Sequence, residues 1–455
     1  MKRKALADLQ KWMNNPNRKP LIVWGSRQVG KSYLIKEIFA KQFFPDKYVY
    51  IDFRLEKDIN AFCFDNVDPK QIMTFISLIK NTNIDENTLL IFDEIQECPA
   101  IITSLKYFCQ NFRKQPVIAT GSMVRTKLKR IVNKRGKGYV QEFLFPVGKI
   151  NQLNLYPMNF EEFLMNYNEN LLNTLKETWN EKKALSNELH QLALETLNKY
   201  LLIGGMPEAV AVFIENEDYY ESREVLKNLY DNYLSDMELY QASTEAVVRS
   251  RKIFKNIYSE LNKESKNFKC NLIEEHSKIR DFKNPLEWLN FAKIVHQSFQ
   301  LKEKVTLPLM QNNDSNFRLY LSDIGMFCYQ SGINPTTFID KRKQNTLSGI
   351  FYENYIATEM ACVDLPLFYW KGKNSSELEF ITENNGQILV IDVKRGRNSL
   401  NSLKKFRDLN KKQLAVKISE NNFGYDKEQK LLTVPLYQAF MLFHDISRGN
   451  LPEMF

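Results

Sequence analysis

Residues 21–32 read LIVWGSRQVGKS, and this stretch decides the fold. An apolar strand, residues 21–24, leads into the pattern GxxxxGK(S/T), and a helical run, SYLIKEIFAK, follows from residue 32. Glycines let such a loop curl, so that its N–H groups and the N-terminus of the next helix face a phosphate. We therefore predict a phosphate-binding loop made of Gly25, Ser26, Arg27, Gln28, Val29, Gly30, Lys31 and Ser32.

A second stretch supplies carboxylates to match this loop. Residues 87–94, NTLLIFDE, form an apolar strand that ends in two adjacent acids. In a triphosphate site Lys31 pairs with the β- and γ-phosphates and the Ser32 hydroxyl binds Mg²⁺. We expect Asp93 to hold the same ion, directly or through water, and Glu94 to act as the general base. The expected ligands are thus a nucleoside triphosphate and Mg²⁺.

The strand PVIAT, residues 116–120, ends in Thr120-Gly121-Ser122. Small polar side chains at the carboxyl end of a parallel strand lie at the ligand crevice. Ser122 or Thr120 is expected to contact the γ-phosphate, and we assign Ser122 to the catalytic set. An ordinary Ser/Thr turn is the alternative. Together, the three elements predict a nucleoside triphosphatase.

Apolar runs alternate with helical stretches around these motifs, which favours a parallel sheet covered by helices on both faces. The expected strands are residues 21–24, 48–53, 89–92, 117–120 and 150–155. From residue 157 to 241 the pattern is helical, with a stop at the GGMP of residues 204–207.

The next segment combines helical and extended patterns. The expected elements are helices at residues 247–261, 271–277 and 285–300 and extended pieces at 304–310 and 317–321. This order resembles a winged helix, a shape that contacts DNA or protein. Both uses stay open.

Basic residues dominate the stretch between positions 125 and 149. They are Arg125, Lys127, Lys129, Arg130, Lys134, Arg135, Lys137 and Lys149, against one acid, Glu142. Three interpretations stay open: an arginine supplied to a neighbouring subunit, a contact with nucleic acid, or a solvated loop.

The C-terminal part holds a hairpin with acids near its base. Asn385-Gly386 is a strong signal for a type I′ turn. Counting outward from that turn predicts three opposed pairs: Asn384 with Gln387, Glu379 with Asp392, and Glu377 with Lys394. The other face is expected to form the core, with Leu378, Phe380, Ile391 and Val393.

Two opposed carboxylates destabilise a sheet unless a positive charge lies between them, and Mg²⁺ or Mn²⁺ suits oxygen ligands. We expect a second metal site at Glu379 and Asp392, with Glu353 from the helix at residues 349–362 and with Lys394 beside it. This set resembles the PD-(D/E)xK nucleases, which hydrolyse phosphodiesters with metal assistance. The acids Glu379 and Asp392 exchange the usual lengths, so a fold that no longer cuts is the open alternative.

Composition limits the remaining classes. The chain has 455 residues, 44% of them hydrophobic and 26% charged, which excludes a disordered or fibrous protein. The formal net charge is +9, which is compatible with polyanionic partners. The six cysteines form no CxxC pair, so we expect no disulfide framework. Without a secretory pattern or an 18-residue apolar run, we expect a cytoplasmic protein that does not cross a membrane.

Taken together, the motifs resemble a bacterial and archaeal family of AAA-like P-loop ATPases with a C-terminal domain of unknown function. The resemblance rests on GSRQVGKS (25–32), DEIQ (93–96), IATGS (118–122), PMNFEEFL (157–164), YLLIGGMPE (200–208) and LYLSDIG (319–325). One departure is Gly148-Lys149 where the family usually has Gly-Arg, and a lysine loses the bidentate fork of an arginine.

The resemblance implies an α/β fold in four parts: a P-loop ATPase core with a parallel sheet (1–165), a helical lid (166–241), a winged-helix-like segment (242–312) and an α/β nuclease-like domain (313–455). We expect a Mg-dependent ATP hydrolase that couples its nucleotide state to a C-terminal half that binds nucleic acid, most simply DNA. The rival is a nucleotide-gated switch that binds a protein partner and has an inactive nuclease-like domain. Ring formation by copies of this chain is suggested by the resemblance alone.

Overall fold

The computed structural model describes residues 1–121, 129–134, 137–142, 145–240, 243–339, 348–373, 376–394, 400–410 and 413–451. Ser122, which we assigned to the catalytic set, lies outside the described residues, as do Arg125, Lys127 and Arg135 of the basic stretch.

The N-terminal core, residues 1–157, is built on a parallel sheet, as the sequence predicts. Its strands are β1 (Leu21–Trp24), β2 (Tyr48–Asp52), β3 (Leu89–Asp93), β4 (Val117–Gly121) and β7 (Asn151–Asn154). They pair in the order β2-β3-β4-β1-β7, and every pairing is parallel. Each residue of β3 and β4 is buried, as is typical of central strands covered on both faces.

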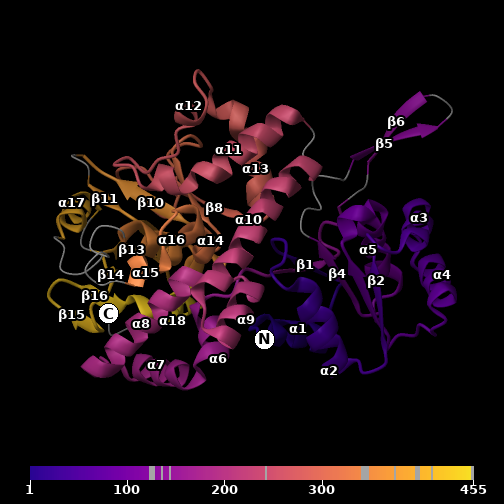
Figure 1. Ribbon diagram of the computed structural model, residues 1–455, viewed down its shortest axis with the longest axis horizontal. Coiled ribbons are helices and arrows are strands. Elements are labelled where there is room, and N and C mark those ends of the chain that lie inside the picture. The colour runs from indigo at the N-terminus through magenta and orange to yellow at the C-terminus, as the bar shows by residue number, and fades with distance from the viewer. Residues whose placement is uncertain are drawn as a thin grey trace.

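Helices cover both faces of this sheet (Figure 1). One apolar cluster joins the sheet to α1 (Ala5–Asn14) and to η1 (Tyr33–Ala40), which has π-helical hydrogen bonding and continues into α2 (Lys41–Phe43). The other cluster joins the opposite face to α3 (Lys57–Asp65), α4 (Pro69–Lys80), η2 (Ile95–Glu97) and α5 (Pro99–Asn111). A separate antiparallel hairpin, β5 (Lys129–Lys134) and β6 (Lys137–Glu142), projects away from the sheet in Figure 1.

The helical pattern after residue 157 is confirmed. It forms α6 (Phe160–Tyr167), α7 (Glu169–Glu181), α8 (Asn187–Ile203), α9 (Pro207–Asn216) and α10 (Tyr219–Tyr240). Side chains of Asn159, Asn168 and Ser186 accept hydrogen bonds from the first turns of α6, α7 and α8, which fixes where these helices begin. The break between α8 and α9 falls at Gly204–Met206, within the expected GGMP stop.

The next helices are α11 (Thr244–Leu261), α12 (Cys270–Ile273), η4 (Ile279–Phe282) and α13 (Lys283–Phe291). The expected helix at 285–300 is wrong in its second half, because residues 295–300 form the strand β8 (Val295–Gln300). Lys293 has a φ of +57°, outside helical geometry, and VHQSFQ then buries Val295 and Ser298. The expected strand at 304–310 is also wrong, and Pro308 within it has no N–H to give to a ladder.

Two further sheets complete the fold. The first has the order β11-β10-β8-β9, from β9 (Phe317–Leu321), β10 (Phe368–Lys371) and β11 (Glu377–Leu378). The second has the order β12-β13-β14-β16-β15, from β12 (Phe380–Asn384), β13 (Gln387–Val393), β14 (Ala415–Ser419), β15 (Gly424–Asp426) and β16 (Leu431–Pro435). The helices around them are α14 (Ile324–Gln330), α15 (Pro335–Ile339), α16 (Ser348–Ala361), α17 (Asn401–Asn410), η6 (Leu436–Gln438) and α18 (Ala439–Ser447).

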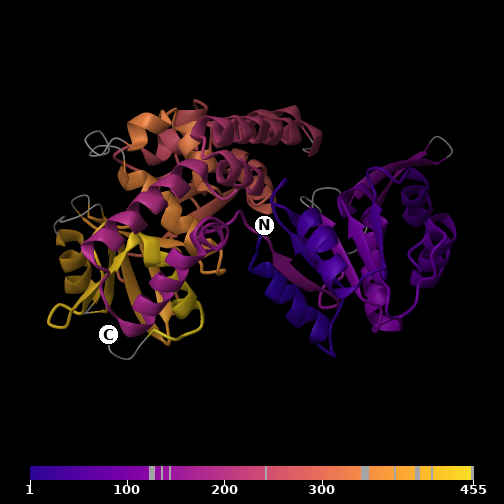
Figure 2. The ribbon, with the colours of Figure 1, turned by 60° about the horizontal axis from the view of Figure 1, so that its bottom comes forward.

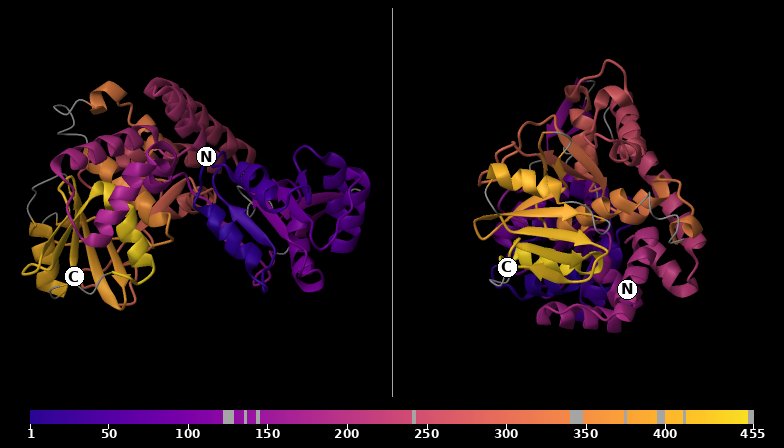
Figure 3. Two further views of the ribbon diagram at one scale, coloured as in Figure 1. Left: turned by 90° about the horizontal axis from the view of Figure 1, so that it is seen from below. Right: turned by 90° about the vertical axis from the view of Figure 1, so that its left-hand side faces the viewer.

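One apolar core runs from Met158 to Ile446, and we call this part of the chain, residues 158–451, the C-terminal body. Helices α6 to α10 pack in the same core as α16 and α18. The expected boundaries at 241/242 and 312/313 therefore fall inside a continuous core, and β8 and β9 pair within a larger sheet. Figures 2 and 3 show the N-terminal core beside this body, with the N-terminus at the junction.

Candidate nucleotide site and C-terminal carboxylate cluster

The predicted phosphate loop lies between β1 and η1, at the carboxyl end of the parallel sheet. Its backbone has positive φ at Gln28 (+61°) and Gly30 (+90°), where glycine is favoured. A Cβ at Gly25 would lie 2.3 Å from the carbonyl oxygen of Leu155, so only glycine fits that position. The sequence pattern thus reflects real steric limits of the loop.

Lys31 is buried and turned into the loop. Its Nζ donates to the carbonyl oxygens of Gly25 at 3.0 Å and Ser26 at 2.8 Å. Burial lowers the pKa of Lys31 to about 8, against the opposing charges of Glu94 and Asp93. The Ser26 side chain in the same loop is 1% exposed. An ammonium and a buried hydroxyl in one loop are donors that a phosphate would satisfy.

Asp93 lies at the end of β3, separated from the loop strand by β4. It is 3% exposed and accepts hydrogen bonds from the Thr120 hydroxyl and, at 2.6 Å, from the Tyr50 hydroxyl. Thr120, one of the two residues expected to contact the γ-phosphate, thus contacts Asp93 here. Ser32 directly precedes the helix η1, and its hydroxyl makes no capping hydrogen bond to that helix.

Glu94 follows with a left-handed backbone (φ +53°) and two partners. Arg54 forms an ion pair with it at 2.8 Å, and the Gln96 side chain donates to its other oxygen. Sequence reasoning did not identify Arg54. The available signal was its position just after β2, because neighbouring parallel strands end at the same edge of the sheet.

Three segments from elsewhere in the chain lie against the loop. From α10 in the C-terminal body, the Tyr233 hydroxyl donates to the Arg27 carbonyl oxygen at 3.3 Å, and Asp236 forms an ion pair with the Arg27 guanidinium. Arg3, beside α1, donates to the carbonyl oxygen of Val29 at 2.9 Å. At the start of α9, Pro207 lies 3.5 Å from where a Cβ on Gly30 would be. These contacts were not predicted.

The C-terminal hairpin confirms the expected turn. Asn385 and Gly386 both have positive φ, and Asn384 pairs with Gln387. Near the base of the hairpin, the Lys394 ammonium lies 3.0 Å from carboxylate oxygens of both Glu379 and Asp392. Burial and then the charge of Glu379 raise the pKa of Asp392. Glu379 and Asp392 thus both contact Lys394, although Glu379 lies between β11 and β12 rather than in a paired strand.

Two expectations at the same hairpin are wrong. Glu377 pairs with Lys371 across the strands β11 and β10 rather than with Lys394, because the chain breaks between β11 and β12 at Glu379. Leu378 packs with Ile381 and Val390, on the face opposite to the expected one. Phe380, Ile391 and Val393 do lie together, in the large core. Both faces of the hairpin are buried.

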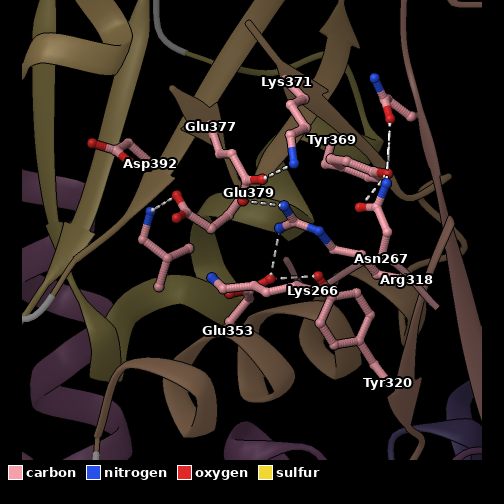
Figure 4. Close-up of polar contacts among 12 residues, drawn as sticks. Lys266, Asn267, Arg318, Tyr320, Glu353, Tyr369, Lys371, Glu377, Glu379 and Asp392 are labelled. Atoms are coloured by element: carbon pink, nitrogen blue, oxygen red, sulfur yellow. Dashed lines mark hydrogen bonds and ion pairs between the residues drawn. The ribbon is translucent and has the colours of Figure 1, made fainter. Parts of the chain in front are cut away.

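Glu353 does not join the acids of the hairpin (Figure 4). Its carboxylate accepts from Arg318 at 3.0 Å and from the Tyr320 hydroxyl at 2.7 Å, and it also pairs with Lys266. Arg318 is fully buried, bonds to Glu377 as well, and has its guanidinium carbon 4.1 Å from the centre of the Tyr369 ring. Figure 4 shows this arginine between the two glutamates.

The expected second metal site stays a prediction. Within the ranges that the structure describes, no group of three or more His, Cys, Asp or Glu side chains is placed to hold a metal ion. Cations of the chain pair with these acids: Lys394 with Glu379 and Asp392, and Arg318 and Lys266 with Glu353.

Three family models match the chain. Residues 17–164 match an AAA domain, residues 194–337 a domain of unknown function (DUF8612), and residues 348–437 a domain of unknown function (DUF4143). No curated protein matches this chain. Together with the five-stranded all-parallel sheet, the AAA match supports an AAA-like P-loop ATPase domain in the N-terminal core. No helix in the described part of the chain is long and apolar enough to cross a membrane.

Proposed function

We propose that the protein is a Mg-dependent ATP hydrolase that transmits its nucleotide state to the C-terminal body. The observation that carries the proposal is the meeting of Lys31, Asp93 and Glu94 at one edge of the sheet. Lys31 is close enough to both acids for their charges to act on its pKa. The AAA domain match over this segment supports the same activity.

Each residue has a role in this proposal. Lys31 exchanges its loop carbonyls for the β- and γ-phosphates. Ser32 and Asp93 would hold Mg²⁺, which would neutralise charge on the phosphate oxygens. Glu94 releases Arg54 and orients a water molecule, which attacks the γ-phosphorus as the bond to the β-phosphate oxygen breaks. Glu94 takes the proton from that water, and ADP leaves.

Phosphate release from Mg-ATP by the full chain tests this activity. Lys31→Ala removes the buried ammonium, and we expect the rate to fall at least about 100-fold because a preorganised charge at the phosphates is lost. Lys36→Ala is the matched control, since Lys36 lies on the same helix with a half-exposed side chain paired to Glu37. Wild-type release no faster than that of Lys31→Ala would contradict the proposal.

For the partner of the C-terminal body we propose a nucleic-acid backbone. The support is the net charge of +9 and the exposed lysines Lys404 and Lys405 on α17. Duplex DNA is then expected to stimulate phosphate release, with an effect that weakens as salt rises. Hydrolysis that is indifferent to DNA would favour a protein partner.

A second candidate function follows from the charge pairing in Figure 4: a nucleotide-gated interaction switch with an inactive nuclease-like fold. The pairing of Lys394 with both hairpin acids, and of Arg318 with Glu353, favours a body that binds without cutting. We expect no cleavage of DNA with Mg²⁺ or Mn²⁺, and no difference between wild type and Asp392→Ala. Metal-dependent cleavage that Asp392→Ala abolishes would instead establish a nuclease.

A further inference from the structure

The helix α10 connects the phosphate loop to the C-terminal body. Its inner face, with Leu226, Leu229, Tyr233 and Met237, is part of the large core of that body. One turn apart on the same helix, Tyr233 and Asp236 reach Arg27 of the phosphate loop. A movement of Arg27 therefore changes the contacts of α10, which is a helix of the C-terminal body.

Asp236 is an unusual group to find at a phosphate site. Its side chain is 1% exposed, and Oδ1 pairs with Arg27. The second oxygen, Oδ2, is buried and has no hydrogen-bond partner among the residues that the structure describes. Burial raises the pKa of Asp236 even though Arg27 opposes that shift, and Glu94 adds a like charge nearby. The carboxylate depends on Arg27 for its stability in this place.

A triphosphate and Asp236 compete for the same arginine. Arg27 belongs to the loop that holds the phosphates in our proposed function, and a guanidinium pairs strongly with phosphate oxygens. Like charges repel strongly where water is excluded, so the phosphates and the Asp236 carboxylate are unfavourable neighbours. We propose that Arg27 and Asp236 form a latch between the phosphate loop and α10, which nucleotide phosphates open by taking Arg27 from Asp236.

This inference rests on the proposed nucleotide site and adds the contact through which nucleotide binding affects the C-terminal body. Coupling between two sites is reciprocal. If nucleotide raises the affinity for a partner that draws α10 away from the loop, that partner raises the affinity for nucleotide by the same factor. The latch thus gives a route by which a ligand of the C-terminal body controls the ATPase.

Calorimetric titration of the full chain with a non-hydrolysable ATP analogue and Mg²⁺ tests the latch. Removing the competing charge with Asp236→Asn is expected to tighten binding at least about fivefold. Asp231→Asn, on the exposed side of the same helix, is the matched control and is expected to bind as wild type does. Tyr233→Phe, which removes one hydroxyl, is expected to tighten nucleotide binding by a smaller factor than Asp236→Asn does.

Hydrogen exchange provides a second measurement. Nucleotide should speed exchange in the last turns of α10 in wild type, and Asp236→Asn should show faster exchange there without nucleotide. Unchanged or weaker binding by Asp236→Asn, while wild type binds, overturns the latch but leaves the nucleotide site intact. A wild type that binds no nucleotide overturns the proposed function, and the latch with it.

Discussion

Glu94→Gln is expected to lower the rate of ATP hydrolysis by about 100- to 10,000-fold while leaving ATP binding within a few-fold of wild type. The amide keeps the size of the carboxylate, and its oxygen can still accept a hydrogen bond from Arg54, but it cannot accept the proton of the attacking water. Single-turnover hydrolysis measures the first effect, and equilibrium binding of a fluorescent ATP analogue measures the second.

Glu86→Gln is the control for this change. Glu86 precedes β3 at its amino end, whereas Glu94 follows the carboxyl end of the same strand, and Glu86 pairs only at the surface, with Lys114 at 3.4 Å. We expect wild-type hydrolysis from this variant. If Glu94→Gln hydrolysed ATP as fast as Glu86→Gln, the general base would have to be another residue.

Local sequence predicts the strand, the loop and the paired acids of the candidate nucleotide site, and the structure places these elements at one edge of the parallel sheet. The strand, the loop and the start of the helix lie within residues 21–32. Asp93 is the last residue of the buried strand β3, and Glu94 comes directly after it. Arg54 and Asp236 were not predicted, because each reaches the site only through tertiary structure. Asp236 in particular depends on how α10 of the body packs against the loop, which no local pattern encodes.

The same distinction explains the C-terminal hairpin. The Asn-Gly turn predicts the register correctly from Asn384 to Phe380, because strand pairing alternates regularly away from a turn. The count fails at Glu377, because the break at Glu379 moves β11 to the other sheet. The helix expected at 285–300 fails for a related reason: a short segment such as VHQSFQ, with Val295 and Phe299 as its apolar residues, suits either structure until its partners β9 and β10 are known.

Arg318→Met is expected to destabilise the C-terminal body by about 3–5 kcal/mol, because it removes one partner from a buried ion pair and leaves Glu353 and Glu377 with less compensation. The carboxylates of Glu353 and Glu377 raise the pKa of Arg318 although burial opposes the charge, so the arginine is charged in the folded state. Urea unfolding followed by tryptophan fluorescence measures the loss, since Trp370 is fully buried in the body.

Lys371→Met is the control for this change. Lys371 pairs with the same Glu377 at 3.1 Å, but its side chain is 33% exposed. Solvent screens that pair, so we expect a loss below about 1 kcal/mol. Equal losses from both variants would show that Arg318 contributes no more than a surface cation.

Stability that rises in millimolar Mn²⁺ in Arg318→Met, but not in wild type, would show that the arginine occupies a place a metal can take. Since Lys266 and Lys394 still neutralise Glu353, Glu379 and Asp392 after the change, we expect no such rise in either protein.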